Sequence, residues 1–180
     1  HGGGFYNPQK YQVGPKVMPE GHLHWFYWES YWTWMSGFAL FVVLYLWNAN
    51  TFLIDTRVFA WPAPWMAVAA SLVYLVAGWL VYDVICRLFG HNKDGSIGGD
   101  LRVGGLIFVY VCIATWIACH LFAGRAAFLL TGAMIATIMS ANVFFWIIPG
   151  QRKVVADLQA GRQPDPIHGQ RGKQRSVHNT

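Results

Sequence analysis

The chain has 180 residues, of which 55% are hydrophobic, 17% are aromatic and only 12% are charged. Soluble domains carry about 25% charged residues, so this composition excludes an ordinary soluble protein and predicts a membrane protein. The three cysteines form no C-x-x-C pair, which excludes a zinc knuckle and covalent haem attachment of that type within the chain. The net charge of +5 does not indicate nucleic-acid binding, because the aromatic residues are not interleaved with the basic ones.

Residues 1–30 form a Gly-rich and aromatic-rich entry segment that we expect at the membrane surface. Residues 25–34 read WFYWESYWTW, and Trp and Tyr gather where lipid headgroups meet hydrocarbon. His22 and His24 are one residue apart, which makes them weak candidates for metal ligands. Glu29 lies at the edge of the first membrane helix, where a carboxylate is costly unless it is paired or hydrated.

Four apolar stretches predict an all-α, polytopic membrane bundle. A helix needs about 20 mostly apolar residues to cross the hydrocarbon core of a bilayer. The predicted transmembrane helices are residues 31–47, 65–84, 103–122 and 126–148. Together they make a membrane domain over residues 31–148, and the short Ala123-Gly124-Arg125 turn predicts that the last two helices form an antiparallel hairpin.

Single polar residues interrupt these spans and their loops. Asp55 is expected to pair with Arg57 in the first loop, and Asp83 with Arg87 one helical turn later. His120 is the only strongly polar residue of the third span. It is interpreted either as a histidine whose hydrogen bonds are satisfied by its surroundings or as a weak candidate for a metal or haem ligand.

The last span carries small residues at every fourth position, Gly132, Ala136 and Ser140, which predicts close packing against another helix. Asn142 lies inside this span, where its amide needs a hydrogen-bond partner. Pro149 and Gly150 are predicted to end the helix. The remaining segment, 149–180, is basic and broken by Pro and Gly, with a short surface helix expected over 151–160.

The positive charges predict the orientation. An even number of spans puts both ends of the segment on one side, and that side carries 11 of the 13 Lys and Arg residues. Positive residues favour the cytoplasmic side, so both ends are predicted to be cytoplasmic. Glu29, Asp83 and Asn142 then lie at one depth near the cytoplasmic face.

Several sequence blocks resemble one family over nearly the whole chain. They are HGGGFY at the start, W-x-x-W-E-x-Y-x-T-W-x-S-G-F-A-L from Trp25, FLID from Phe52, GWLVYD from Gly78, G-A-M-x-x-T-I-M-x-x-N-V-F-F-x-I-I-P-x-Q-R-K from Gly132, and PDP with KQRSVHN from Pro164. In this order they resemble the membrane domain of the bacterial membrane-bound, cytochrome-c-linked urate oxidases, also called urate hydroxylases.

The resemblance implies oxidation of urate to 5-hydroxyisourate, with the electrons passing to cytochrome c. It implies a bacterial inner-membrane domain of about eight helices, of which this chain matches a part. The expected partners are the lipid bilayer, a cytochrome c domain or protein and other membrane subunits, and no nucleic acid. A haem is a candidate cofactor, with ligands partly outside this chain.

Urate is a purine anion, so its site needs amide groups, a cation and a base. Glu29 and Asn142 are the candidate catalytic residues, and Gln151 and Arg152 the candidate substrate-binding residues. His22, His24 and His120 are the weak metal-ligand candidates.

One departure from the family pattern leaves an alternative open. The family pattern has a His two residues before G-A-M, where this chain has Leu130. The alternative is a related but non-catalytic transmembrane subunit of a larger electron-transfer or photosynthetic complex.

Overall fold

The computed structural model describes residues 26–92 and 96–179. Within these ranges every regular element is helical, and the only other pairing is an isolated bridge between His91 and Ile97. The elements are α1 (Phe26–Phe41), the π-helical turn η1 (Val42–Trp47), α2 (Ala49–Phe52), α3 (Pro64–Phe89), α4 (Asp100–Leu121), α5 (Gly124–Asn142), the π-helical turn η2 (Val143–Ile147), α6 (Ile148–Gln159) and α7 (Pro166–His178). The predicted all-α class is therefore confirmed for the described residues.

Three helical stretches of the described residues are long and apolar enough to cross a membrane, not the four that were predicted. They are Pro64–Phe89, Asp100–Leu121 and Gly124–Gln159. The other predicted span, Tyr31–Trp47, is a shorter apolar helix. At 1.5 Å per residue it extends about 26 Å, which is less than the roughly 30 Å of the hydrocarbon core.

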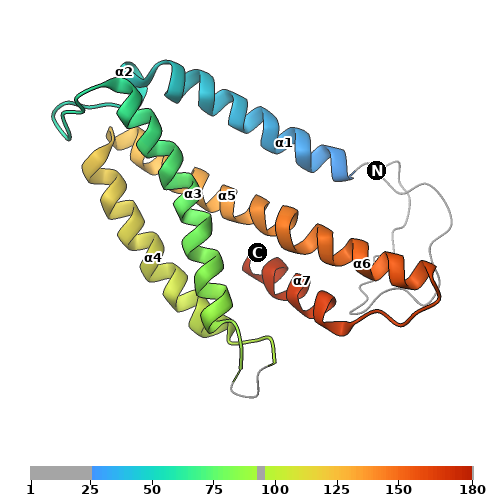
Figure 1. Cartoon of the computed structure of the whole chain (residues 1–180). Coiled ribbons are helices and arrows are strands. Elements are labelled where there is room, and N and C mark those ends of the chain that lie inside the picture. The colour runs from blue at the N-terminus through green and yellow to red at the C-terminus, as the bar shows by residue number, and fades with distance from the viewer. Residues whose placement is uncertain (1–25, 93–95, 180) are drawn as a thin grey trace, which may run out of the picture.

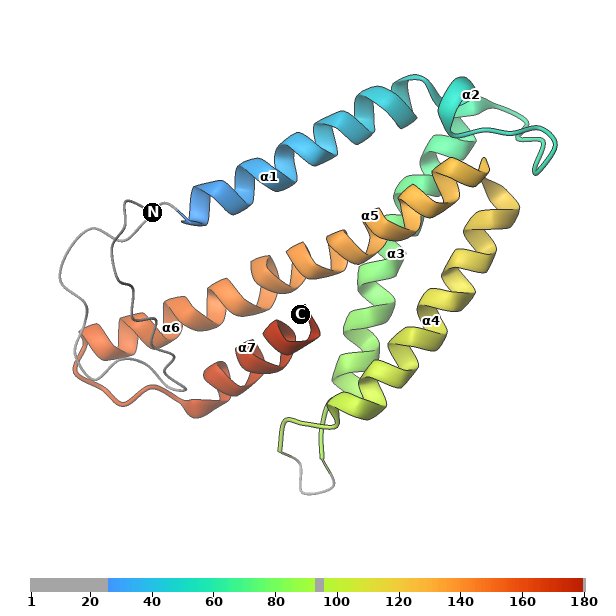
Figure 2. The same ribbon diagram turned by 180° about the vertical axis from the view of Figure 1, so that it is seen from behind.

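The three long helices form the body of the molecule (Figure 1). α4 runs antiparallel beside α3, and α5 crosses α3 and continues through η2 and α6 beyond the end of α3. α1 runs along the other side of α5 and joins the bundle through α2 (Figure 2). α7 turns back beside α6, so that the C-terminal end lies close to α3.

The closest packing between α3 and α5 lies at Gly78, where an added Cβ would overlap the Met134 side chain. Leu130 and Met134 are fully buried on the packed face of α5. Gly132 and Ala136 are exposed instead, and a Cβ at Gly132 would meet nothing within 4 Å. The predicted small-residue face is therefore not the face that packs, because α5 places large side chains over a glycine of α3.

The α4–α5 connection confirms the predicted antiparallel hairpin. Only Phe122 and Ala123 separate the two helices, and the Ala123 N–H donates to the Leu53 carbonyl at 3.0 Å. The Trp61 indole N–H donates to the Leu121 carbonyl at 2.9 Å. These bonds satisfy backbone groups that a helix end leaves without intrahelical partners.

The prediction that α5 ends at Pro149 is wrong, because the helix continues into α6. Proline inside a helix lacks an N–H donor and crowds the carbonyl four residues before it. Here the π-helical turn Val143–Ile147 ends two residues before Pro149, and such turns are places where the regular hydrogen-bond ladder is interrupted. Gly161, with φ of 68°, lies just beyond the end of α6.

Candidate functional site

The C-terminal segment forms the helix α7, although its Pro and Gly residues were expected to keep it irregular. Asp165 caps the helix, since its Oδ1 accepts a hydrogen bond from the Ile167 N–H at 2.9 Å. Pro166 is the first helical residue, where its missing N–H has no cost. The P-D-P sequence is thus a helix start, and the helix it begins lies against the bundle.

A buried ion pair joins α7 to α3. Arg175 Nη2 donates to Asp83 Oδ1 at 2.8 Å, and the two side chains are only 5% and 8% exposed. Asp83 Oδ2 also accepts from Arg87 Nε at 2.6 Å, which confirms the predicted pair within α3. Trp146 Nε1 donates to Asp83 Oδ1 at 2.9 Å. These three donors compensate for the removal of the carboxylate from water.

Asn142 has the partners that its position inside a span requires. Its Nδ2 donates to Tyr82 Oη at 2.9 Å and to Asn179 Oδ1 at 3.1 Å. Its Oδ1 accepts from Arg175 Nη1 at 3.5 Å. Asn142 is fully buried, and its contacts bring α3, α5 and the end of α7 together.

His178 links Tyr82 to Asp100. His178 Nε2 lies 3.6 Å from Asp100 Oδ1, and because this nitrogen faces a carboxylate, we assign the ring proton to it. His178 Nδ1 then accepts from the Tyr82 O–H at 2.9 Å, and Tyr82 Oη in turn accepts from Asn142 Nδ2. Burial lowers the pKa of His178 below its ordinary value of 6.5; Asp100 opposes this shift and Arg175 adds to it. His178 is therefore neutral at pH 7. Tyr82, Asp83, Asn142, Arg175 and His178 are called the polar cluster below.

Hydrogen bonds from Gln174 connect α7 to the turn between α3 and α4. Its Nε2 lies 3.1 Å from both the Gly90 and the Gly98 carbonyl oxygens and 3.2 Å from Asp100 Oδ1. The Gly90 carbonyl follows the last residue of α3, where backbone acceptors lack helical partners. The amide thus satisfies a helix end and holds α7 in place.

Trp146 lies among three guanidinium groups. The Cζ atoms of Arg87, Arg171 and Arg175 are 5.2, 6.0 and 4.9 Å from the centre of its ring. Arg175 also lies 5.1 Å from the ring centre of Tyr82. Such cation–π contacts favour positive charge beside an aromatic face, and they concentrate arginines from α3 and α7 around η2.

A pocket of about 140 Å³ opens beside the polar cluster, between η2, α6 and α7. Its lining residues are Phe145, Trp146, Pro149, Gly150, Lys153, His168 and Arg171. Among the described residues, no carboxylate forms an ion pair with Lys153 or Arg171. The pocket therefore combines aromatic walls with two cations that form no ion pair with a described residue.

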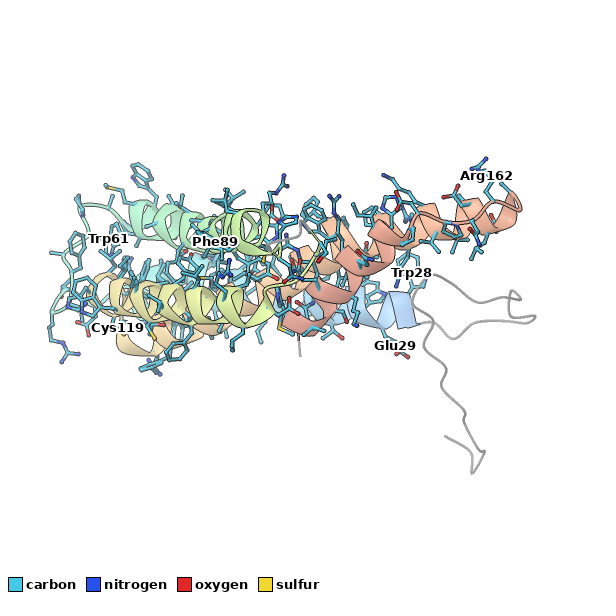
Figure 3. The ribbon with its side chains drawn as sticks, turned by 90° about the horizontal axis from the view of Figure 1, so that it is seen from below. Trp28, Glu29, Trp61, Phe89, Cys119 and Arg162 are labelled. Atoms are coloured by element: carbon cyan, nitrogen blue, oxygen red, sulfur yellow. The ribbon has the colours of Figure 1, made fainter. Side chains whose placement is uncertain are left out.

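The predicted catalytic residues occupy different surroundings. Asn142 belongs to the polar cluster, whereas Glu29 is exposed near the start of α1. Figure 3 shows Glu29 well separated from Phe89, the last residue of α3. The ring of Tyr31 meets that of Phe144 edge-on, with centres 5.5 Å apart, so this part of α1 lies beside η2. The catalytic roles of Glu29 and Asn142 stay predictions.

The two predicted substrate-binding residues lie on the surface of α6. Gln151 and Arg152 are exposed and are not among the residues that line the pocket, whereas the adjacent Lys153 is. A helix turns by about 100° per residue, so neighbours in sequence face different directions. Their role in binding substrate also stays a prediction.

His120 is the described candidate for a haem or metal ligand, and this role stays a prediction. His120 is exposed, and its Nδ1 lies 2.8 Å from the carbonyl oxygen of Trp116, within its own helix. Figure 3 shows the neighbouring Cys119 at the end of the molecule that also holds Trp61, far from Arg162 beyond α6. No group of three His, Cys, Asp or Glu side chains that could hold a metal occurs in residues 26–92 and 96–179. His22 and His24 lie outside the described residues, and we derive no step through a haem.

The site residues that α7 contributes were not predicted from the sequence. Arg171, Gln174, Arg175 and His178 follow a spacing of three to four residues, which places them on one side of a helix. That spacing, together with the Asp165 cap, is the signal that would have found them. Tyr82 carries no such signal, because tyrosine is common at membrane interfaces.

The chain matches the Urate oxidase N-terminal family over residues 1–180. Searches of curated proteins and of solved structures give no match. The family match covers the helices that form the polar cluster and those that line the pocket. This chain therefore belongs to the Urate oxidase N-terminal family.

Proposed function

We propose that this chain is part of a membrane-bound urate oxidase that converts urate to 5-hydroxyisourate and passes the electrons to a cytochrome c. The family match over residues 1–180 is the observation that carries the proposal. The three long apolar helices support its membrane setting. The proposed membrane is the bacterial inner membrane, and the charge distribution favours an orientation with the α7 end in the cytoplasm, where purine breakdown supplies urate.

The reaction adds the oxygen of water to the purine. Urate and one water give 5-hydroxyisourate, two protons and two electrons, as a C–O bond forms at C5. Each cytochrome c accepts one electron, so two are reduced for each urate. The protein must bind a flat anion, accept protons and provide a route for electron transfer to cytochrome c.

The polar cluster supports a site at the α7 end. It holds the amide of Asn142 and the neutral imidazole of His178 in fixed orientations among buried partners. Glu29 remains the candidate base and Asn142 the candidate amide, with Gln151 and Arg152 as the candidate groups for recognition. The cluster positions α7, and α7 brings His168 and Arg171 to the pocket.

The test is an assay of the purified full chain, together with any segments that its gene adds. We expect urate loss accompanied by reduction of two ferric cytochromes c per urate and no release of hydrogen peroxide. Replacing a general base costs about 100-fold or more in kcat, so Glu29→Gln should lower kcat by that factor. Asn142→Ala should also lower it, and Lys173→Gln, an exposed change on α7, should not.

The outcomes separate the parts of the proposal. Absence of urate turnover would contradict the activity, and release of peroxide without cytochrome reduction would contradict the electron route. Unchanged kcat in both Glu29→Gln and Asn142→Ala would show that the assigned catalytic residues are wrong.

A second function has one observation in its favour. Leu130, which stands where the family pattern has a His, is fully buried on the packed face of α5. An aliphatic side chain there cannot bind a metal or carry a proton. A colourless protein that lacks urate turnover and co-purifies with other electron-transfer subunits would favour a non-catalytic membrane subunit.

A further inference from the structure

We infer that the pocket between η2, α6 and α7 binds a planar heteroaromatic anion, and that Lys153 and Arg171 hold its charge. The inference rests on the proposed function only in naming that anion as urate. The pocket contains none of the residues that the sequence analysis assigned to substrate binding. The position that we infer for the substrate therefore differs from the position of Gln151 and Arg152.

The charge of the pocket favours an anion. Lys153 comes from α6 and Arg171 from α7, so cations face the pocket from two elements. Two carboxylates of the adjoining helices have other partners: Asp83 binds Arg87 and Arg175, and Asp157 binds Arg162. Since Lys153 and Arg171 form no ion pair with a described residue, a bound anion would supply their counter-charge at short range and with partial exclusion of water.

The shape of the pocket favours a flat ring. The apolar part of its lining consists of the rings of Phe145 and Trp146, together with Pro149 and Gly150. A Cβ on Gly150 would lie 3.5 Å from the His168 carbonyl oxygen, so α6 and α7 approach closely here. Aromatic walls stabilise a flat ring, whereas a hydrated phosphate gains little from them. The combination favours an aromatic anion over an inorganic one.

Contacts within the protein hold part of the pocket lining in place before a ligand binds. The indole N–H of Trp146 is held by Asp83 at 2.9 Å, which fixes one wall. Arg171 is one helical turn before Arg175, whose buried ion pair with Asp83 anchors α7. Lining groups that are already in place lose less conformational entropy when a ligand binds. The polar cluster thus acts as the support of the pocket.

The experiment measures binding of radiolabelled urate to the full chain in nanodiscs of zwitterionic phosphatidylcholine. Arg171→Gln and Lys153→Gln should each raise Kd about tenfold, the effect of losing roughly one charge-assisted contact. Lys173→Gln removes the same charge from an exposed position of α7 and should leave Kd unchanged. Arg171→Lys should retain much of the affinity, and matching unfolding temperatures will show that the variants fold.

Two further measurements test whether inorganic phosphate or an anionic lipid headgroup, and not urate, is the anion that the pocket binds. Inorganic phosphate should compete with urate only weakly, and nanodiscs that contain anionic phosphatidylglycerol should bind urate as well as neutral ones. Equal competition by phosphate would show a site that recognises charge alone, and loss of urate binding in anionic nanodiscs would show a lipid headgroup site. Either result overturns the inference, as would an unchanged Kd in both glutamine variants.

Kinetics separates this inference from the proposed function. If the full protein oxidises urate, Arg171→Gln should raise KM with little change in kcat, because the contact is made to bound substrate. Normal turnover with an unaltered KM would refute the pocket while the proposed function stands. Urate binding that depends on Arg171 without any turnover would support the pocket and refute the activity.

Discussion

The interface between α3 and α5 has two halves that are stabilised in different ways. In one half, Gly78 packs beneath Met134, and Leu130 is buried nearby, without a charge. In the other, Asp83 and Asn142 are buried with Arg175 from α7, which is 92 residues from Asp83 in sequence. The apolar half is completed by neighbouring helices, whereas the polar half needs a segment from the end of the chain.

The two halves of the interface differ in how well they tolerate substitutions. Apolar packing depends on volume, and a flexible side chain such as Met134 adjusts to moderate changes. A buried ion pair depends on each partner, because removing one leaves an uncompensated charge in a medium of low polarity. The attachment of α7 is therefore more sensitive to single substitutions than the apolar half.

The largest expected effect comes from Asp83→Asn. It leaves the guanidinium of Arg175 buried without its carboxylate, so the free energy of unfolding should fall by about 3–5 kcal/mol. Chemical unfolding of the purified protein measures this loss, and trypsin should cleave α7 more readily. Asp55→Asn is the matched control, because its pair with the exposed Arg57 lies at the surface and its removal should change neither readout.

A double variant sharpens this test. Asp83→Leu combined with Arg175→Met replaces the buried pair by apolar side chains and should recover much of the lost stability. If the double variant is no more stable than Asp83→Asn, the unpaired charge is not the cause of the loss.

An intermediate effect is expected at Gly78. The added methyl group of Gly78→Ala overlaps Met134, and overpacking of this kind costs about 1–3 kcal/mol. Gly132→Ala, on the exposed face of α5, should be neutral or slightly stabilising. Thermal unfolding compares the two variants. Met134→Ala in the Gly78→Ala background should recover part of the loss, and equal effects at the two glycines would contradict the packing described.

The smallest expected effect is a pH dependence of the α7 attachment. The lowered pKa of His178 means that its stabilising contribution is complete above pH 6.5 and declines as the pH falls below 6.5 towards the folded-state pKa. Protonation would also end its acceptance of the Tyr82 hydrogen bond. The groups that face the ring are Tyr82, Cys86, Asp100 and Arg175.

Hydrogen exchange of the α7 amides measures this effect. Exchange corrected for its intrinsic rate should be faster at about pH 5.5 than at about pH 7.5, since the unfolded state binds the additional proton. His178→Gln should flatten the profile, and the exposed His120→Gln should not alter it. A profile that stays unchanged in His178→Gln would assign the dependence to another group.

Features that depend on neighbours in sequence could be predicted. The long apolar stretches indicated the helices, and the spacing of Asp83 and Arg87 predicted their ion pair. The Asp55–Arg57 pair and the short α4–α5 turn followed from equally local patterns. Asn142 could be identified as a residue in need of partners, although the sequence did not show which ones.

The sequence by itself determined the helical class, the apolar helices and the membership of the Urate oxidase N-terminal family. Only the tertiary structure decided that α5 continues past Pro149 and that α7 folds back against α3. The physical reason is the separation along the chain over which each interaction acts. Hydropathy and helix spacing act over a few residues, whereas the partner of a buried charge is chosen by which segments the whole fold brings together, as with Arg175 and Asp83.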